Sequence, residues 1–153
     1  MTASPTTATI DEVAGLVGAQ LGPSSWRAIP QADIDVYADL SGDDNPIHVN
    51  EELAAQSPYG GRIAHGMLTL SMMVPHLREI YRVTGAGMGI VYGFNKIRFP
   101  NAVPSGGRIR VRGHVESVTA IEGGWQVVLP LTFELEGATK PACVAEIVLR
   151  HYR

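Results

Sequence analysis

Hydrophobic and polar positions follow one period in the first half of the chain and another in the second half. In the first half, apolar residues recur at three- and four-residue spacing, which predicts helices over residues 10–20, 32–40 and 66–83. The last of these segments is apolar on every side, so we expect a helix that is buried over most of its surface. Pro75 lies inside it and should kink or divide it, because proline cannot donate the interior helical hydrogen bond.

After Gly89 the period changes to two, which is the spacing of strands. The pattern predicts strands over residues 90–99, 108–116, 125–135 and 142–152, with glycine turns at 123–124 and 136–137. Pro130 faces away from the apolar side of its strand and suggests an edge strand or a bulge. Helices followed by long antiparallel strands predict an α+β domain in which the sheet wraps around the apolar helix.

Composition and charge narrow the class of protein. A chain of 153 residues with 45% hydrophobic and 18% charged residues can fold around one core, which excludes a disordered protein. A net charge of −3 gives no reason to expect nucleic acid or a membrane as a partner. The single cysteine, Cys143, excludes an internal disulfide framework and is expected in the core. We therefore expect a flexible tail over residues 1–8 and one cytoplasmic domain over residues 9–153.

The most informative chemistry lies in the loop after the second predicted helix, which contains Asp43 and His48. Gly42 and Pro46 exclude a continuous helix here, and an irregular loop can turn both side chains toward one point. A carboxylate and an imidazole around one water molecule are suited to general acid/base catalysis. The alternative is a turn in which Asp43 or Asp44 hydrogen-bonds the loop backbone, and from spacing alone the turn is the better explanation.

A second candidate is Gly66, which stands at the start of the apolar helix. Backbone N–H groups in a first helical turn are unpaired and lie at the positive end of the helix dipole, so they can stabilise a developing oxyanion. A glycine also leaves room for a substrate carbonyl to approach the backbone. The alternative is that Gly66 only relieves crowding around the helix.

Two runs of residues together resemble the hydratase motif of MaoC-like dehydratases, which are (R)-specific enoyl-CoA hydratases with the hot-dog fold. They are Gly42-Asp43-Asp44-Asn45-Pro46-Ile47-His48 and Ile63-Ala64-His65-Gly66-Met67. Residues 92–100 and 103–106 also look like the strand and turn that follow the central helix in this family. The resemblance extends from about Trp26 to Arg150.

The resemblance implies a hydro-lyase that adds water to a trans-2-enoyl thioester, or removes it from a (3R)-3-hydroxyacyl thioester. Asp43 and His48 match the catalytic pair, and Gly66 matches the glycine whose amide polarises the thioester carbonyl. Asn45 and His65 are candidate substrate-contacting residues, with loop shape and packing as the respective alternatives. The resemblance also implies a homodimer with joined sheets and an acyl-CoA tunnel at or near the interface. Coenzyme A would then enter as part of the substrate, and we expect no other cofactor.

Arg108 and Arg110 share one strand face with Arg112 and are candidate ligands for the phosphates of coenzyme A or for an acidic carrier protein. The alternative, which we favour, is a solvated strand face. The histidines show no metal-ligand spacing, so we expect no metal site. Two other functions remain open at this point, namely an acyl-CoA thioesterase with a hot-dog fold and a non-catalytic acyl-binding domain.

Overall fold

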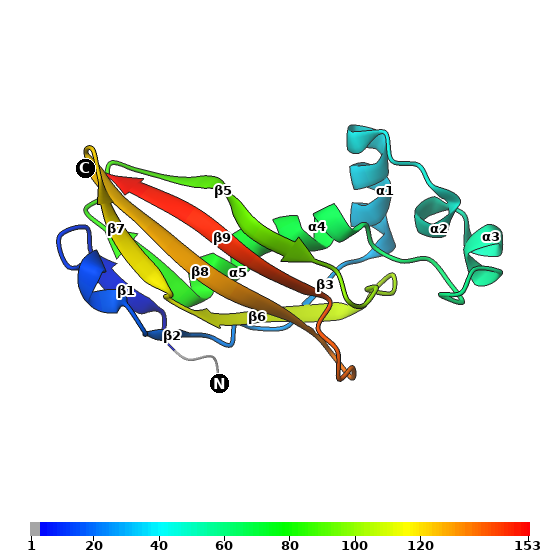
Figure 1. Ribbon diagram of the computed structural model, residues 1–153. Helices are drawn as coiled ribbons and strands as arrows, with labels where there is room; N and C mark the ends of the chain where they lie inside the picture. The colour runs from blue at the N-terminus through cyan, green and yellow to red at the C-terminus, as the bar shows by residue number, and fades with distance from the viewer. Residues whose placement is uncertain (1–3) are drawn as a thin grey trace.

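A long antiparallel sheet curves around two consecutive helices, α4 (Gly66–Ser71) and α5 (Met73–Ile80), in the computed structural model, which describes residues 4–153 (Figure 1). The order of the sheet is β2 (Gln20–Leu21), β6 (Arg108–His114), β8 (Gly124–Leu135), β9 (Cys143–Tyr152) and β5 (Met88–Arg98), with β3 (Arg27–Ala28) beside β6 and β7 (Ser117–Ile121) beside β8. The expected α+β hot-dog arrangement, with a sheet wrapped around an apolar helix, is confirmed.

Alternating burial explains why the central strands form one face of the core. In β8 the odd-numbered residues from Val127 to Leu135 are buried, and the even-numbered residues between them are only partly buried. Register places apolar residues opposite each other across β8 and β9, as in the pair Leu129 and Ile147. Such cross-strand pairs are the unit of sheet stabilisation. All four predicted strands are confirmed, with ends that differ by a few residues.

Pro130 lies in the middle of the sheet, so the expectation of an edge strand is wrong. The interruption of regular strand pairing that Pro130 suggested is nevertheless present. Strand β8 pairs with β7 as far as Val128 and with β6 only from Leu131 onward. Pro130 thus stands where the partner strand changes, which is a position where a missing N–H costs no regular ladder hydrogen bond on that side.

The helix predicted over residues 66–83 is divided at Met72 into α4 and α5, so the expected effect of Pro75 is confirmed. Its predicted end is wrong, because β4 (Tyr81–Thr84) begins directly after Ile80. The helix predicted over residues 32–40 is confirmed as α1 (Gln31–Ser41).

The first part of the chain differs most from expectation. The helix predicted over residues 10–20 is wrong, because only the short 3-10 helix η1 (Val13–Leu16) forms there. Strand β1 (Thr6–Thr9) pairs in parallel with β4. The flexible tail expected as far as residue 8 is therefore wrong for residues 6–8, while residues 1–3 lie outside the described part of the chain. No helix within residues 4–153 is long and apolar enough to cross a membrane.

Two short helices, α2 (Pro46–Val49) and α3 (Glu51–Ala55), join α1 at one end of the sheet (Figure 1). They lie beyond the start of α4, so the loop that holds Asp43 and the glycine at the start of α4 belong to the same end of the molecule.

Candidate active site

Asn45, and not an aspartate, makes the hydrogen bond that shapes the Asp43 loop. Helix α1 ends at Gly42, whose φ of 75° is the left-handed conformation that glycine adopts readily. The Asn45 side chain then accepts a hydrogen bond from the N–H of Ile47 at 3.2 Å and caps α2, with Pro46 as the first helical residue. Among the described residues the Asp43 carboxylate has no hydrogen-bond partner. The side chain that hydrogen-bonds the loop backbone is therefore that of Asn45, and not that of Asp43 or Asp44 as the turn alternative assumed.

His48 is held in one tautomer by a backbone carbonyl. Its side chain is buried, and Nδ1 lies 2.8 Å from the carbonyl oxygen of Ile63. A carbonyl oxygen can only accept, so Nδ1 donates and the lone pair of the neutral ring is on Nε2. The Ile63 N–H in turn donates to the carbonyl oxygen of Ile47 at 3.0 Å, which ties the 62–65 segment to α2. His48 is thus prepared to accept a proton at Nε2.

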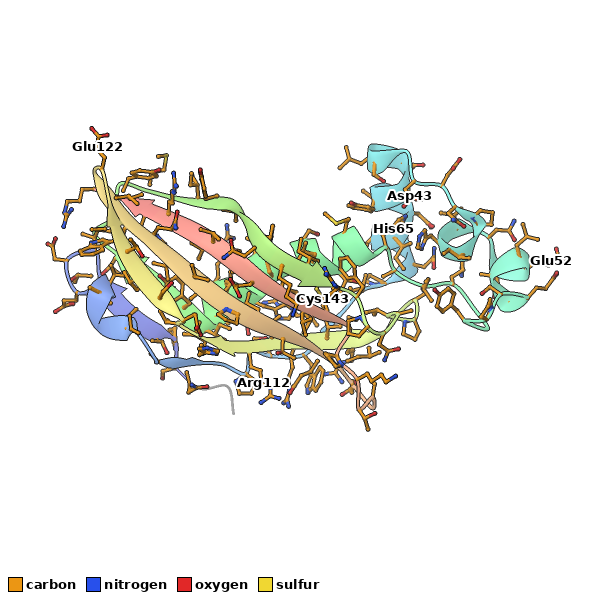
Figure 2. The ribbon with its side chains drawn as sticks, in the orientation of Figure 1. Asp43, Glu52, His65, Arg112, Glu122 and Cys143 are labelled. Carbon is orange, nitrogen blue, oxygen red and sulfur yellow. The ribbon has the colours of Figure 1, made fainter. Side chains whose placement is uncertain are left out.

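The structure brings His65 together with both Asp43 and His48. The His65 and His48 rings are stacked with centroids 3.8 Å apart, and His65 Nε2 lies 2.8 Å from the backbone oxygen of Asp43. A carboxylate oxygen of Asp43 and one nitrogen of each ring all lie within 4.8 Å of one another. Figure 2 shows Asp43 and His65 side by side near the start of α4.

Gly66 is the first residue of α4, so its N–H has no intrahelical partner. A Cβ atom at this position would lie 3.2 Å from ring atoms of Phe99, which is closer than ordinary van der Waals contact. A side chain at position 66 would therefore push against the Phe99 ring, which would have to shift by a few tenths of an ångström. Sequence reasoning did not identify Phe99 as a site residue, and only its place in the 92–100 run gave a signal.

Two adjacent cavities share Gly66 and Phe99 in their walls. The first has a volume of about 460 Å³ and is lined by Asp43 and His65. The second has a volume of about 230 Å³ and is lined by His48. Asp43 and His48 thus line two cavities that both reach Gly66 at the start of α4.

Arg108 and Arg110 lie away from this site, on the outer face of the sheet. Arg108 pairs with Glu136 at 3.1 Å, while Arg110 and Arg112 both pair with Glu134. Figure 2 shows Arg112 on the side of the sheet that faces away from Asp43. The structure does not bring these arginines to the acid/base pair, and their environment is that of the solvated, ion-paired strand face.

The Asp43, His48 and His65 group has ligand atoms near enough for a metal ion, but its geometry suits one poorly. The two imidazole rings are stacked at an interplanar angle of 27°. Lone pairs of nitrogen lie in the ring plane, so nearly parallel rings direct them side by side instead of toward one ion. Tetrahedral coordination would require the rings to separate. The residues present therefore fit an acid/base site better than a metal site.

Cys143 is fully buried on β9, and burial raises the pKa of its thiol to about 12. A thiol with a raised pKa is a poor nucleophile at neutral pH. The expectation that Cys143 is a core residue is confirmed.

Comparisons with known proteins agree on one family. The family model described as "MaoC like domain" matches residues 12–131. The chain is 39% identical to 3-hydroxyacyl-thioester dehydratase Z of Mycobacterium tuberculosis over 93% of this chain and 95% of that protein. It is 38% identical to nodulation protein N of Rhizobium leguminosarum over 88% of this chain and 85% of the relative. Among solved structures, the (R)-hydratase from A. caviae involved in PHA biosynthesis superposes with a TM-score of 0.71 at 22% identity, over 87% of this chain and 94% of the other.

Proposed function

This chain belongs to the MaoC-like domain family and is a hydro-lyase, and on that premise we propose that it interconverts (3R)-3-hydroxyacyl thioesters and trans-2-enoyl thioesters. The observation that carries the proposal is the meeting of three groups at one end of the sheet. They are the unpartnered carboxylate of Asp43, the His48 ring with its Nε2 lone pair, and the N–H of Gly66.

Each group has one task in the proposed reaction. In hydration, the Asp43 and His48 pair removes a proton from a water molecule, and the water oxygen forms a bond to C3. The electron pair of the double bond moves through C2 to the thioester oxygen, where the Gly66 N–H stabilises the negative charge. The proton is then delivered to C2 from the same side. Dehydration follows the same steps in reverse.

The substrate is proposed to be an acyl thioester, and the carrier of the acyl group is a separate question. The relative from M. tuberculosis is named for a thioester without a stated carrier. Because Arg108 and Arg110 are engaged by glutamates on the outer face, they give little support to a phosphate site there. A comparison of kcat/KM for one acyl group carried by coenzyme A and by an acyl-carrier protein would decide between the two substrates.

A homodimer joined along β5 is also proposed. Strand β5 is the last strand of the sheet, and its residues 88–92 are exposed even though they include apolar side chains. A cavity of about 520 Å³ lies beside them against α5 and is lined by Val74, Leu77 and Leu149. An antiparallel pairing of two copies of β5 would bring the start of each strand near the end of the other, where Phe99 and Gly66 lie. The apolar cavity of one subunit could then receive the acyl chain from the acid/base pair of the other.

The test of the proposed function is incubation of the protein with crotonyl-CoA while enoyl absorbance and free thiol are both followed. Loss of absorbance without release of thiol, with (3R)-3-hydroxybutyryl-CoA as the product, supports the proposal. Thiol release at the same rate as the loss of absorbance would instead identify a thioesterase. Binding of the acyl-CoA without any turnover would identify an acyl-binding domain.

A further inference from the structure

The His65 side chain contacts both residues of the proposed acid/base pair, through the His48 ring and the Asp43 backbone oxygen. It is the N-cap residue of α4 and is 2% exposed, so its ring is fixed by the protein on nearly every side. One face stacks on the His48 ring, and the Tyr37 ring lies at a centroid distance of 4.8 Å. Its place is therefore set by packing and not by solvent.

The hydrogen bond of His65 determines which of its nitrogens carries the proton. Nε2 lies 2.8 Å from the backbone oxygen of Asp43, and a carbonyl oxygen can only accept. Neutral His65 is therefore protonated at Nε2. Its Nδ1 is buried and has no hydrogen-bond partner among the described residues. The ring thus acts as a donor toward the Asp43 loop and as a flat surface toward His48.

No direct bond fixes Asp43 relative to His48. Within residues 4–153, no hydrogen bond or ion pair joins the two side chains; Asp43 belongs to the loop after α1, and His48 belongs to α2. His48 is tied to Ile63, whereas the Asp43 backbone is tied to His65 and, through its own N–H, to Ser41 Oγ at 3.2 Å. The His65 ring, which stacks on His48 and hydrogen-bonds to the Asp43 backbone, therefore connects the two residues.

We propose that His65 is a positioning residue, which holds the Asp43 loop against the stacked His48 ring by a donated hydrogen bond. This inference rests on the proposed function of the site. A misplacement of reacting groups by about 1 Å can reduce a rate roughly a hundredfold.

Two substitutions separate the hydrogen bond from the stacking. His65→Phe keeps an aromatic ring beside His48 but has no donor for the Asp43 carbonyl. His65→Gln has no ring but retains a neutral N–H donor of similar reach. We expect His65→Phe to lower kcat for crotonyl-CoA hydration at least about tenfold while KM changes less than about threefold, and His65→Gln to recover most of the lost kcat. The matched control is His114→Gln, which removes an exposed histidine on β6 that contacts Glu116, and it should keep wild-type kcat.

Amide hydrogen exchange in the 43–48 segment provides a readout that does not depend on turnover. Exchange should be faster in His65→Phe than in the wild-type protein and close to wild type in His65→Gln, at equal global stability. Wild-type exchange in His65→Phe, or equal loss of kcat in both variants, would overturn the positioning role. If wild-type protein fails to hydrate crotonyl-CoA, the proposed function falls, and the exchange comparison still decides whether His65 holds the loop.

Discussion

At the scale of single residues, neighbouring polar side chains in the Asp43 loop have different roles. One of them stabilises the backbone, and another is left available for the proposed catalysis. Asn45 satisfies the backbone at the start of α2, and Pro46 fills the first helical position, where an N–H is not needed. The Asp43 carboxylate is thereby left without a structural partner. A loop rich in turn-forming residues can thus present a free carboxylate without leaving its own backbone unsatisfied.

Asp43→Asn tests the role assigned to this carboxylate. Asparagine has the same shape but cannot take up or release a proton, so kcat should fall roughly a hundredfold or more. Thermal stability should stay close to wild type, because the carboxylate of Asp43 makes no hydrogen bond within the described residues. The control is Asp44→Asn, an equally exposed neighbour to which no role is assigned. Equal activity of Asp43→Asn and wild type would contradict the acid/base assignment and favour an acyl-binding domain.

Gly66→Ala tests the contact between the helix start and Phe99. The new Cβ would lie 3.2 Å from the Phe99 ring, so either the ring or the helix must shift. We expect kcat to fall at least about tenfold and the melting temperature to decrease by a few degrees. The double variant Gly66→Ala/Phe99→Leu should regain stability without regaining activity, because the Cβ still obstructs the approach of a thioester carbonyl. Recovery of full activity in the double variant would show that the glycine matters only for packing.

At the scale of elements, a buried polar network fastens the segment before β3 to helix α5. The Val111 N–H donates to Ser24 Oγ at 2.9 Å, and Ser24 Oγ is also hydrogen-bonded to His76 Nδ1 at 2.8 Å. Burial and, to a smaller extent, the nearby Arg27 cation lower the pKa of the fully buried His76 to about 4, although the Glu79 carboxylate acts in the opposite direction. The Glu79 carboxylate accepts hydrogen bonds from Ser25 and Arg27. The central helix is thus anchored by a histidine that must remain neutral.

This network predicts that stability decreases in mild acid. Between the ordinary pKa of about 6.5 and the folded-state pKa of about 4, the unfolded chain binds a proton that folded His76 excludes. The free energy of unfolding should therefore fall as the pH is lowered from 6.5 to 4, by up to about 3 kcal/mol in total. Urea unfolding at pH 7 and pH 5 measures the effect. His76→Gln should be less stable at pH 7 and show a smaller loss on acidification, whereas His114→Gln should keep the wild-type slope. If the free energy of unfolding of His76→Gln depended on pH as strongly as that of the wild-type protein, His76 would not be the cause of the acid sensitivity.

Glu79 extends the acid sensitivity to lower pH. Burial alone would raise its pKa, but the hydrogen bonds from Ser25 and Arg27 outweigh burial and lower the pKa to about 2. The stabilisation by its ionised form is therefore complete above about pH 4.5 and is lost as the pH falls toward 2.

Elements were predictable where their side-chain pattern is strong and local. The alternation in β6 and β8 and the spacing in α1 indicated these elements correctly. The pattern failed over residues 10–20 and beyond Ile80, where β1 and β4 pair across a large distance in sequence. Short segments of this kind have weak local preferences, and their conformation is decided by the partner strand.

At the scale of the whole molecule, the β5 edge of the sheet has apolar side chains in contact with solvent. Met88 is 51% exposed and Val91 is 44% exposed on β5, while Met67 and Val74 are exposed on the adjacent helices. An edge strand normally carries features that prevent pairing with another chain. Exposed apolar side chains on an edge strand instead fit the proposed homodimer.

Val91→Lys tests this surface. A charge placed on the β5 edge should oppose association, because two copies of the lysine would be brought close to the interface. We expect the mass measured by light scattering to change from that of a dimer to that of a monomer, with loss of hydratase activity if the acyl chain needs both subunits. Val17→Lys alters a residue of similar exposure in the segment that contacts Val115 and should leave the mass unchanged. A wild-type protein with the mass of a monomer would overturn the proposed dimer.

The sequence by itself determined the α+β class, the apolar central helix and the loop with Asp43 and His48, because each depends on the order of residues within a short segment. Only the tertiary structure decided which side chains meet. In it, the His65 ring stacks on the His48 ring and the Phe99 ring lies against Gly66. Arg108 and Arg110 lie on the outer face of the sheet, away from the candidate site. These contacts join residues that are distant along the chain or face different ways on one strand. Their geometry therefore follows from how the sheet curves around α4 and α5, which no local pattern records.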